Sequence, residues 1–502
     1  MNGAHAIMAA LRDAGIRVCF VNPGTSELHL VSALERTADL RAILCLFEGV
    51  ATGAADGFAR MAGVPAATVL HQGAGLAYGL ANLHNAGRAA SPVVNVIGDG
   101  ATTLRGLSAP LESDVAALAA PMSSWVHTVG DPSHAGADAA AAVAAAKGPP
   151  AGVATLIVPA DMAWSPNGRP APPASAGPRP GRAPEPSAIG PGTTLLLGGA
   201  ALRARGLAAA DRLAQATRVR ILAEPFPGRL EQGAGVPPIK RLSADPDTAS
   251  RQLAGSRKLV LVDAAPPVRA FAEPDTSAVL TPAGCTVEHL DGDVLAGLEE
   301  LAARLAPQRQ GRAQQPIGPT AIADAPLTAD GVAQVAGALL PEGAIVVDEA
   351  NTSSVALPCG TARHDLLTNP GFAIGLGMPL AIGAALACPD RPVICLEADG
   401  SAMYTPSALW TQARERLNIT TIVLVNRGYA ILRKARQRLL GETGASPLFD
   451  LSNPDLDFVA LAAAMGVPGH RAISTADLAA RLTHALARPG PHLIEAIVPP
   501  RF

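Results

Sequence analysis

Two apolar runs separated by one helical segment constrain the fold of this chain more than any other feature. The first run covers residues 392–396, a helix-period segment covers 406–417, and the second run covers 420–425. Strand, helix and strand in this order predict one βαβ crossover, which joins two parallel strands. A polar turn follows each run, at 398–401 and at 426–429. Because open α/β sheets bind ligands at the carboxyl ends of their strands, both turns are candidate parts of one site.

The two turns are rich in oxygen atoms that could bind a cation. Asp399 offers a carboxylate, Asn426 a side-chain carbonyl, and the turn at Gly428 a main-chain carbonyl. These oxygens suit Mg²⁺, which keeps few protein ligands and completes its octahedron with phosphate and water. Gly400 and Ser401 open a helix, where free N–H groups can hold a phosphate. An Asp-Gly turn that only caps a helix explains the same residues, so the spacing alone leaves both interpretations open.

Strand and helix patterns alternate along the chain and divide it into three domains. The domains cover residues 1–163, 191–305 and 327–502, and proline-rich linkers separate them at 164–190 and 306–326. The alternation predicts an α/β fold class with an open parallel sheet in each domain and a smaller central domain. The expected strands lie at 18–21, 40–47, 66–70, 92–97, 151–158, 195–197, 219–223, 259–262, 344–347, 392–396, 420–425 and 492–498.

The composition excludes several classes of protein. Hydrophobic residues make up 49% of the chain, charged residues 16%, and the net charge is −3, so a large core is available and no basic surplus favours nucleic acid or an acidic membrane surface. Six cysteines lie mostly in apolar runs without CxxC spacing, which predicts reduced core residues of a cytoplasmic protein. No apolar stretch reaches the ~20 residues that span a bilayer. The N-terminus lacks the features of a signal peptide.

Polar residues also follow three expected strands of the first domain. The turn 22–27, Glu48 and His71 come in succession at strand ends, so we expect them to gather along one edge of the sheet. Each has a structural explanation as well. Thr25 can cap the next helix, Glu48 can interact with a helix dipole, and a strand-end histidine such as His71 is often a hydrogen-bonded structural residue.

The stretch around the two oxygen-rich turns resembles a signature of thiamine diphosphate (ThDP) enzymes in the superfamily of acetolactate synthase large subunits and benzoylformate decarboxylase. That signature is GDG, a βα crossover and NN, whereas this chain has Ala398 before Asp399 and Val425 before Asn426. Neither change removes a position that binds the metal in the family. The resemblance implies that Asp399, Asn426 and Gly428 bind Mg²⁺ and that Gly400, Ser401 and Tyr429 contact the cofactor.

Three segments of the first domain resemble the same superfamily. The segment 48–63, EGVATGAADGFARMAG, is similar to E-x-x-A-x-x-A-A-D-G-Y-A-R, which implies that Glu48 hydrogen-bonds the aminopyrimidine and so helps to remove the proton from thiazolium C2. The segment 70–75, LHQGAG, is similar to LHSAAG and implies that His71 contacts substrate. The segment 21–28, VNPGTSEL, resembles an active-site turn of benzoylformate decarboxylase. It implies a catalytic position for Thr25 and cofactor contacts for Asn22, Pro23 and Gly24.

Two segments of the third domain complete the expected cofactor site. The segment 348–354 resembles a loop that meets the diphosphate, which implies contacts from Asn351 and Thr352. The segment 371–379, GFAIGLGMP, resembles G-G-x-x-G-x-x-[LM]-P. It implies that Ile374 is the apolar wedge that holds ThDP bent, with Gly375 beside it. From the residues alone, a glycine-rich turn for close helix packing explains this segment equally well.

The resemblance covers nearly the whole chain and implies ThDP- and Mg²⁺-dependent decarboxylation of a 2-oxo acid. The resulting enamine is then protonated or attacks a second carbonyl compound. We expect an acetolactate synthase-like reaction without FAD, since no FAD-binding pattern is found in the central domain. The alternative is an aldehyde-releasing decarboxylase similar to benzoylformate decarboxylase. Against it, the stretch 268–273 puts Ala where that family has His.

Two interpretations from other classes remain open. One is a catalytically silent ThDP-fold partner subunit, against which the retained Glu48, Asp399 and Asn426 argue. The other is a nucleotide-binding dehydrogenase that uses the turn 198–199, which we expect to lack the required acidic residue and GxGxxG spacing. The family resemblance also implies a homodimer or homotetramer, in which Glu48 meets ThDP held by a neighbouring chain.

Overall fold

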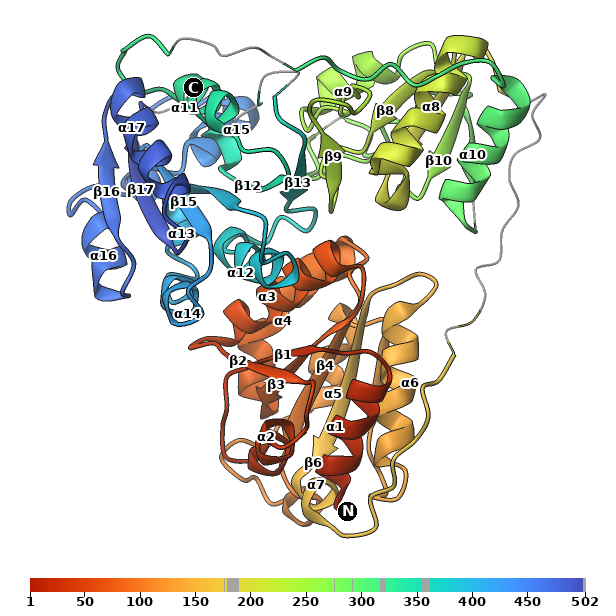
Figure 1. The fold of residues 1–502 in the computed structure, drawn as a ribbon, viewed down its shortest axis with the longest axis vertical. Coiled ribbons are helices and arrows are strands. Elements are labelled where there is room, and N and C mark those ends of the chain that lie inside the picture. The colour runs from red at the N-terminus through yellow and green to blue at the C-terminus, as the bar shows by residue number, and fades with distance from the viewer. Residues whose placement is uncertain are drawn as a thin grey trace.

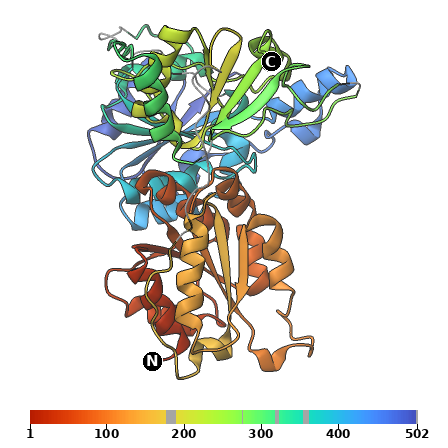
Figure 2. The same ribbon diagram turned by 90° about the vertical axis from the view of Figure 1, so that its right-hand side faces the viewer.

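The computed structural model contains three α/β units, each built on its own sheet, and so confirms the predicted fold class (Figures 1 and 2). It describes residues 1–175, 177, 189–274, 276–290, 292–316, 322–353, 357 and 361–499. In Figure 1 the first unit lies below, and the central and third units lie side by side above it. Within the described residues no helix is long and apolar enough to cross a membrane.

The first unit is a six-stranded sheet in the order β2-β1-β3-β4-β6-β5, with all neighbours parallel. Its strands alternate between two cores, since Phe20 packs on one face while Cys19 and Val21 pack on the other. The strands are β1 Val18–Val21, β2 Arg41–Leu44, β3 Ala66–His71, β4 Val93–Asp99, β5 Trp125–Thr128 and β6 Val153–Pro159; the helices are α1 Gly3–Asp13, α2 Leu28–Glu35, α3 Glu48–Ala62, α4 Gln72–Arg88, η1 Thr102–Leu104, α5 Val115–Ala119, η2 Ala120–Met122, α6 Ala135–Lys147 and α7 Ala160–Trp164.

One expectation for the first unit is wrong, and one strand was not predicted. The strand expected at 40–47 ends at Leu44, and Glu48 is the first residue of α3, because Phe47 is extended and forms the N-cap. The strand β5 had no counterpart among the expected strands. Its four residues are all partly exposed, so they lack the continuous apolar run that marks its buried neighbours.

The central unit is a four-stranded parallel sheet in the order β11-β10-β7-β8. Its edge strand β11 was not expected, because its side chains are mostly exposed. Parts of the two predicted linkers, residues 176, 178–188 and 317–321, lie outside the described residues. The elements are β7 Thr193–Leu197, η4 Gly199–Leu202, α8 Ala204–Thr217, β8 Arg220–Ala223, α9 Pro246–Leu253, β10 Lys258–Val262, β11 Thr286–Leu290 and α10 Val294–Leu305.

The third unit is a seven-stranded sheet in the order β16-β17-β15-β14-β12-β13-β9. The neighbours β14 and β15 are parallel, which confirms the predicted crossover. Its helical part is shorter than predicted and consists of α13 and α14. The elements are α11 Ala329–Leu339, β12 Ala344–Glu349, η5 Asn351–Ser353, β13 His364–Thr368, α12 Gly377–Ala387, β14 Val393–Ala398, α13 Asp399–Ala402, α14 Ala408–Arg414, β15 Ile419–Val425, α15 Ala430–Leu440, η6 Pro447–Phe449, α16 Phe458–Ala464, β16 Gly469–Ala472, α17 Thr475–Leu486 and β17 His492–Ile497.

One strand crosses from the central segment into the third sheet. β9 (Leu230–Gln232) lies within the predicted central domain 191–305 but pairs antiparallel with β13. The neighbouring Arg229 forms an ion pair with Asp365 at 2.6 Å and donates to the main chain of Arg60 and Met61. The central segment therefore ties the first and third units together.

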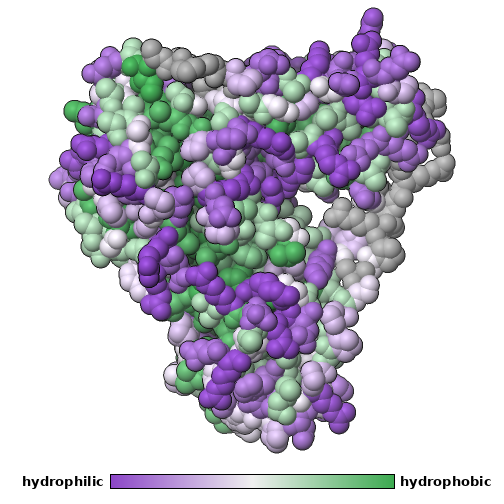
Figure 3. All heavy atoms as spheres, viewed as in Figure 1, coloured by the Kyte–Doolittle hydropathy of each residue, from purple (hydrophilic) through white to green (hydrophobic). Residues whose placement is uncertain are grey.

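The first and third units share one hydrophobic core. Helix α3 lies against α12 so closely that a Cβ on Gly57 would collide with the carbonyl of Leu380, and one on Gly383 with the carbonyl of Ala54. Glycine at these positions lets the two backbones approach. On the face drawn in Figure 3, hydrophobic residues also reach the surface between these two units. This packing fixes the loops at the ends of both helices relative to one another.

Candidate functional site

The two oxygen-rich turns meet at the carboxyl edge of the third sheet. Asp399 directly follows β14 and Asn426 directly follows β15. The Asp399 carboxylate accepts the main-chain N–H groups of Gly400 at 2.8 Å, Asn426 at 3.0 Å and Arg427 at 2.7 Å. Burial raises the pKa of Asp399, while these N–H groups act in the opposite direction. The carboxylate is therefore held by the backbone of the neighbouring turn.

The donor atoms of this edge fit a hard cation. Asn426 is buried, and its side-chain oxygen accepts the N–H of Gly428 at 3.0 Å, which folds the turn tightly around it. Arg427, between them, has a φ of 56°, an unusual backbone conformation, and the carbonyl of Gly428 accepts the N–H of Ala430 at 2.9 Å. A carboxylate, an amide oxygen and a main-chain carbonyl within one turn-pair are the ligand types that Mg²⁺ prefers.

A third turn joins this edge from β12. Asn351 has a φ of 51° and donates its side-chain N–H to the hydroxyl of Ser401 at 2.8 Å. The ring of Tyr429 lies against Gly400, where a Cβ would come within 2.5 Å of it. Thr352 lies next to Asn351 in η5. The structure thus brings together residues that the sequence placed in three separate segments.

The loop with Ile374 and Gly375 lies between the first and third units. Gly375 has a φ of 91°, and its carbonyl accepts the hydroxyl of Thr405 at 3.0 Å. Asn82 on α4 approaches the same carbonyl at 3.4 Å and donates to the carbonyl of Gly49 at 2.7 Å. Because Gly49 follows Glu48 directly, Asn82 links the loop to the start of α3.

At the carboxyl edge of the first sheet, Glu48 and His71 lie together as predicted. Glu48 is 6% exposed. Within the described residues no group donates a hydrogen bond to its carboxylate. A Cβ built on Gly75 would lie 2.9 Å from Glu48 Oε1 and 3.3 Å from His71 Cβ. Glycine at position 75 therefore leaves room for the Glu48 carboxylate beside the histidine.

Glu27 holds the histidine, although the sequence predicted no role for it. His71 Nδ1 lies 2.8 Å from Glu27 Oε2 and 3.0 Å from the hydroxyl of Ser26. Glu27 is fully buried and also accepts the N–H of Gly24. Thr25, which was the candidate catalytic residue of this turn, is exposed, and its neighbour Ser26 contacts His71 instead. Thr25 does not cap α2 either, since Glu27 is the N-cap residue. Asn22 and Pro23 lie in the same turn.

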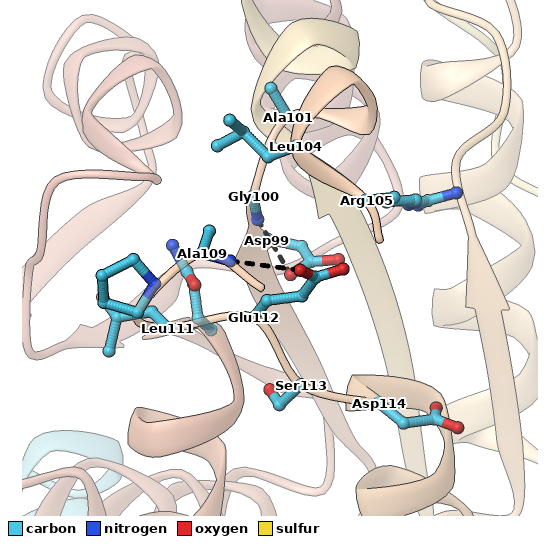
Figure 4. Close-up of a pocket in the computed structure, with 12 residues that line it drawn as sticks. Asp99, Gly100, Ala101, Leu104, Arg105, Ala109, Leu111, Glu112, Ser113 and Asp114 are labelled. Carbon is cyan, nitrogen blue, oxygen red and sulfur yellow. Dashed lines mark hydrogen bonds between the residues drawn. The ribbon is translucent and has the colours of Figure 1, made fainter. Parts of the chain in front are cut away.

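A cavity of about 640 Å³ opens at the same edge of the first unit (Figure 4). Gln72, which follows His71, and Asp99, at the end of β4, lie on its wall together with the segment 100–114. Its volume is in the range of small-molecule sites. The carboxylates of Asp99 and Glu112 line the cavity. Burial raises the pKa of Asp99, and the charge of Glu112 adds to this effect. The hydrogen bond from Gly100 and the charge of Arg105 lower the pKa of Asp99 and partly offset the rise. The segment has no strand or helix period, so the sequence did not predict this cavity.

The central sheet carries an acidic residue at the position where we expected none. Glu224 follows β8, one helix after the turn 198–199. Burial, together with the charge of Asp263, raises the pKa of Glu224 to about 7. Asp263 accepts the N–H of Ala200 at 3.1 Å. The expected absence of this acid is therefore wrong. The GxGxxG spacing of a dinucleotide site is still missing from this turn.

Both ends of the chain match families of known proteins. Residues 1–119 match "Thiamine pyrophosphate enzyme, N-terminal TPP binding domain", and residues 355–496 match "Thiamine pyrophosphate enzyme, C-terminal TPP binding domain". The "Putative acetolactate synthase large subunit IlvX" of Mycobacterium tuberculosis is 48% identical over 99% of both chains. Benzoylformate decarboxylase of Pseudomonas aeruginosa is 32% identical over 97% of this chain and 96% of that protein.

Solved structures resemble the whole chain. The ThDP-dependent 4-hydroxybenzoylformate decarboxylase of Rhodococcus jostii RHA1 has a TM-score of 0.84 and 25% identity, with 99% of each chain covered. Benzoylformate decarboxylase of Polynucleobacter necessarius has a TM-score of 0.80 at 22% identity, over 100% of this chain and 99% of that one, which shows a shared fold.

Proposed function

The chain belongs to the family of thiamine diphosphate-dependent enzymes that includes acetolactate synthase large subunits and benzoylformate decarboxylase, and on this premise we propose that it decarboxylates a 2-oxo acid with ThDP and Mg²⁺. The product then leaves as an aldehyde or is joined to a second carbonyl compound. The observation that carries the proposal is the convergence of the turns after β12, β14 and β15: Asn351 donates to Ser401, and the carboxylate of Asp399 accepts the N–H groups of Asn426 and Arg427.

The third unit would hold the diphosphate end of the cofactor. Asp399, the side-chain oxygen of Asn426 and the carbonyl of Gly428 would bind Mg²⁺. The diphosphate would lie against Ser401 and Asn351, and the remaining contacts would come from Thr352, Gly400, Tyr429, Ile374 and Gly375. When bound, ThDP stabilises the negative charge that develops on the substrate as CO₂ leaves.

The first unit would supply the groups that exchange protons with the cofactor and the substrate. The carboxylate of Glu48 is buried next to His71 and has no donor among the described residues, so it can hydrogen-bond a ring nitrogen of the cofactor. Glu27 and Ser26 fix Nδ1 of His71, which leaves Nε2 as the nitrogen that can exchange a proton with substrate. Asn22, Pro23 and Gly24 would contact the cofactor from the same turn, and Thr25 would act from an exposed position.

Two observations favour joining to a second carbonyl compound over simple aldehyde release. The cavity lined by Gln72, the residue after His71, is large enough for a further small molecule. Phe271, in the stretch 268–273, is 72% exposed. Its ring centre lies 6.5 Å from that of Phe372, in the loop that carries Ile374 and Gly375. A phenyl ring donates no proton, so Phe271 cannot supply one for aldehyde release. The decarboxylase alternative is supported by the His71–Glu27 pair, which can supply that proton.

The assembly is part of the proposal. We expect at least a homodimer in the cytoplasm, with Glu48 of one chain meeting ThDP held by the third unit of another. A silent partner subunit is the other alternative, and the unpaired Glu48 argues against it, because a buried carboxylate without a partner is costly unless a ligand satisfies it.

Dialysed protein supplied with ThDP and Mg²⁺ tests the proposal. We expect CO₂ release from members of a panel of 2-oxo acids that includes pyruvate and benzoylformate, with each cofactor required. Separation of the products into aldehyde and 2-hydroxyketone then decides between the two reactions. Tight ThDP binding without turnover on the whole panel would contradict an enzymatic role and support the silent subunit.

A further inference from the structure

A buried carboxyl group of the third unit, Glu349, holds the loop that carries Ile374 and Gly375. Glu349 ends β12 and is 4% exposed. One of its oxygens accepts the N–H groups of Gly377 at 2.7 Å and Gly375 at 3.2 Å, and the other accepts the side-chain N–H of Asn369 at 2.8 Å. Gly377 is the first residue of α12, so the carboxylate also lies at the positive end of that helix.

Asn369 extends this hold to the other end of the loop. Its oxygen accepts the N–H groups of Gly371 at 3.2 Å and Phe372 at 3.0 Å, and its N–H group also donates to the carbonyl of Ala373 at 2.7 Å. Phe372 has a φ of 63°, a conformation that a residue with a large side chain adopts only at a cost in energy. The side chains of Glu349 and Asn369 thus compensate for a strained loop.

The first unit holds the outer side of the same loop through α4. Asn85 exchanges two hydrogen bonds with the main chain of Ala373, at 2.8 and 3.2 Å. His84 lies 3.1 Å from the carbonyl of Gly371. Because α4 begins directly after His71, the loop is clamped between Glu349 on one side and the helix that follows the candidate catalytic histidine on the other.

This clamp is costly for the sheet that carries it. Glu397 lies beside Glu349 on the neighbouring strand β14 and is 1% exposed. The two carboxyl groups hydrogen-bond each other, and Oε1 of Glu397 has no hydrogen-bond partner. In the described part of the chain, no lysine or arginine forms an ion pair with either carboxyl group. Burial raises the pKa of Glu349. Burying two carboxyl groups side by side without a cation costs more than burying apolar side chains there, so stability alone does not explain their placement.

We propose that Glu349 is a positioning residue for the cofactor: by holding Asn369, Gly375 and Gly377 it fixes Ile374 in the place that bound ThDP requires. The inference rests on the proposed function, because it assigns the loop to the cofactor. Costly interactions concentrate where a ligand site sets the geometry, and supporting residues hold such sites in place. Glu349 itself acts through the loop and does not contact the reacting atoms.

The test compares Glu349→Gln, which keeps the size of the side chain, with Glu495→Gln as a matched control. Glu495 on β17 is also a buried glutamate of this sheet, but it forms an ion pair with Arg471 on β16 at 2.9 Å. For Glu349→Gln we expect the Kd for ThDP to rise about 10- to 100-fold, as for other residues that orient a ligand shell. We expect kcat to fall while KM for the 2-oxo acid stays the same, and the melting temperature of the cofactor-free protein to stay equal or rise. Asn369→Ala should weaken ThDP binding in the same direction.

Three outcomes would overturn the inference. Unchanged ThDP affinity in both Glu349→Gln and Asn369→Ala, with normal binding by the wild type, would overturn this inference and leave the proposed function standing. A fall in the melting temperature of cofactor-free Glu349→Gln that exceeds the fall in Glu495→Gln would show that Glu349 only supports the fold. A wild-type protein that binds no ThDP would overturn the proposed function, and this inference with it.

Discussion

The carboxyl edges of the first and third sheets each present a buried carboxylate, but they hold it in opposite ways. Asp399 accepts three main-chain N–H groups within its own pair of turns. Glu48 accepts none from the described residues, although it is almost as buried. A carboxylate fixed by the backbone suits an anchor, whereas one left without a donor suits a residue whose partner arrives with the ligand. On this basis Asp399 would hold the cofactor and Glu48 would activate it.

The central sheet shows that a strand-end acid need not have either role. Glu224 also follows a parallel strand, and burial raises its pKa to about 7. It lies beside Asp263 at the turn 198–199, which carries no dinucleotide spacing. The position at a strand end is therefore shared by all three units, and the surroundings of the acid decide its role.

The largest effect is expected from Glu48→Gln. The amide cannot take up a proton, so kcat should fall by about 10²- to 10⁴-fold, the usual contribution of a general acid–base group. The affinity for ThDP, measured by titration calorimetry, should stay within a few-fold, since Asp399 and not Glu48 anchors the cofactor. Full activity in Glu48→Gln would remove the distinction between the two carboxylates.

Asp399→Asn should break the anchor. An amide has one acceptor oxygen for three N–H donors and no charge for Mg²⁺, so the affinity for ThDP at fixed Mg²⁺ should fall by at least about 100-fold. Calorimetry or quenching of tryptophan fluorescence measures this affinity. Asp457→Asn is the control, because Asp457 caps α16 elsewhere in the same unit. Binding of ThDP as tight as in the wild type would contradict the assignment of Asp399.

Glu27→Gln should have a smaller effect, because Glu27 acts through His71. Loss of the charged partner leaves Nδ1 less firmly held, and we expect kcat to fall about 10-fold, at the low end for acid–base groups. Replacing a buried, hydrogen-bonded carboxylate should also destabilise the fold by about 1–3 kcal/mol. A steady-state rate equal to the wild type would show that the pair is structural.

Glu224→Gln should leave turnover unchanged and alter only the pH dependence of stability. The pKa of Glu224 in the folded protein is about 7, above its ordinary value of 4.5. Between pH 4.5 and 7 the folded state therefore keeps a proton that the unfolded state has released. The stability that this proton adds to the fold is full below pH 4.5 and is lost as the pH rises through 7. The loss is on the order of 3 kcal/mol.

The variant should remove that loss. Melting temperatures recorded from pH 5 to pH 8 should fall less for Glu224→Gln than for the wild type, and the variant should be the more stable protein at pH 8. An equal decline in both proteins would mean that Glu224 is charged in the fold throughout. A drop in turnover would give the central sheet a role in the site.

The parts of the site that the sequence predicted are those set by local order. Asp399 and Asn426 follow strongly apolar strands, and parallel pairing then brings their turns together without further information. Glu48 and His71 were found in the same way. Glu27 and Glu349 were missed, because their partners lie far along the chain: Glu27 meets a residue 44 positions away, and Glu349 meets the main chain 28 positions away.

The fold shows the same limit. The buried strands β1, β3, β4, β14 and β15 are mostly apolar and were expected near their observed bounds. β9 has three residues and pairs with a strand of another unit, so no local pattern specifies it. The cavity lined by Gln72 and Asp99 depends on how the segment 100–114 returns to the start of α4. Such features follow from tertiary packing, which periodicity does not encode.

The most direct test of the contrast between the two carboxylates is the rate of hydrogen–deuterium exchange at C2 of ThDP bound to the protein with Mg²⁺. It needs no knowledge of the substrate. Glu48→Gln, loaded with cofactor to the same extent as the wild type, should exchange this hydrogen at least about 100-fold more slowly. Equal exchange rates in the two proteins would contradict the account, because the unpaired carboxylate of the first sheet would then have no part in activating the cofactor.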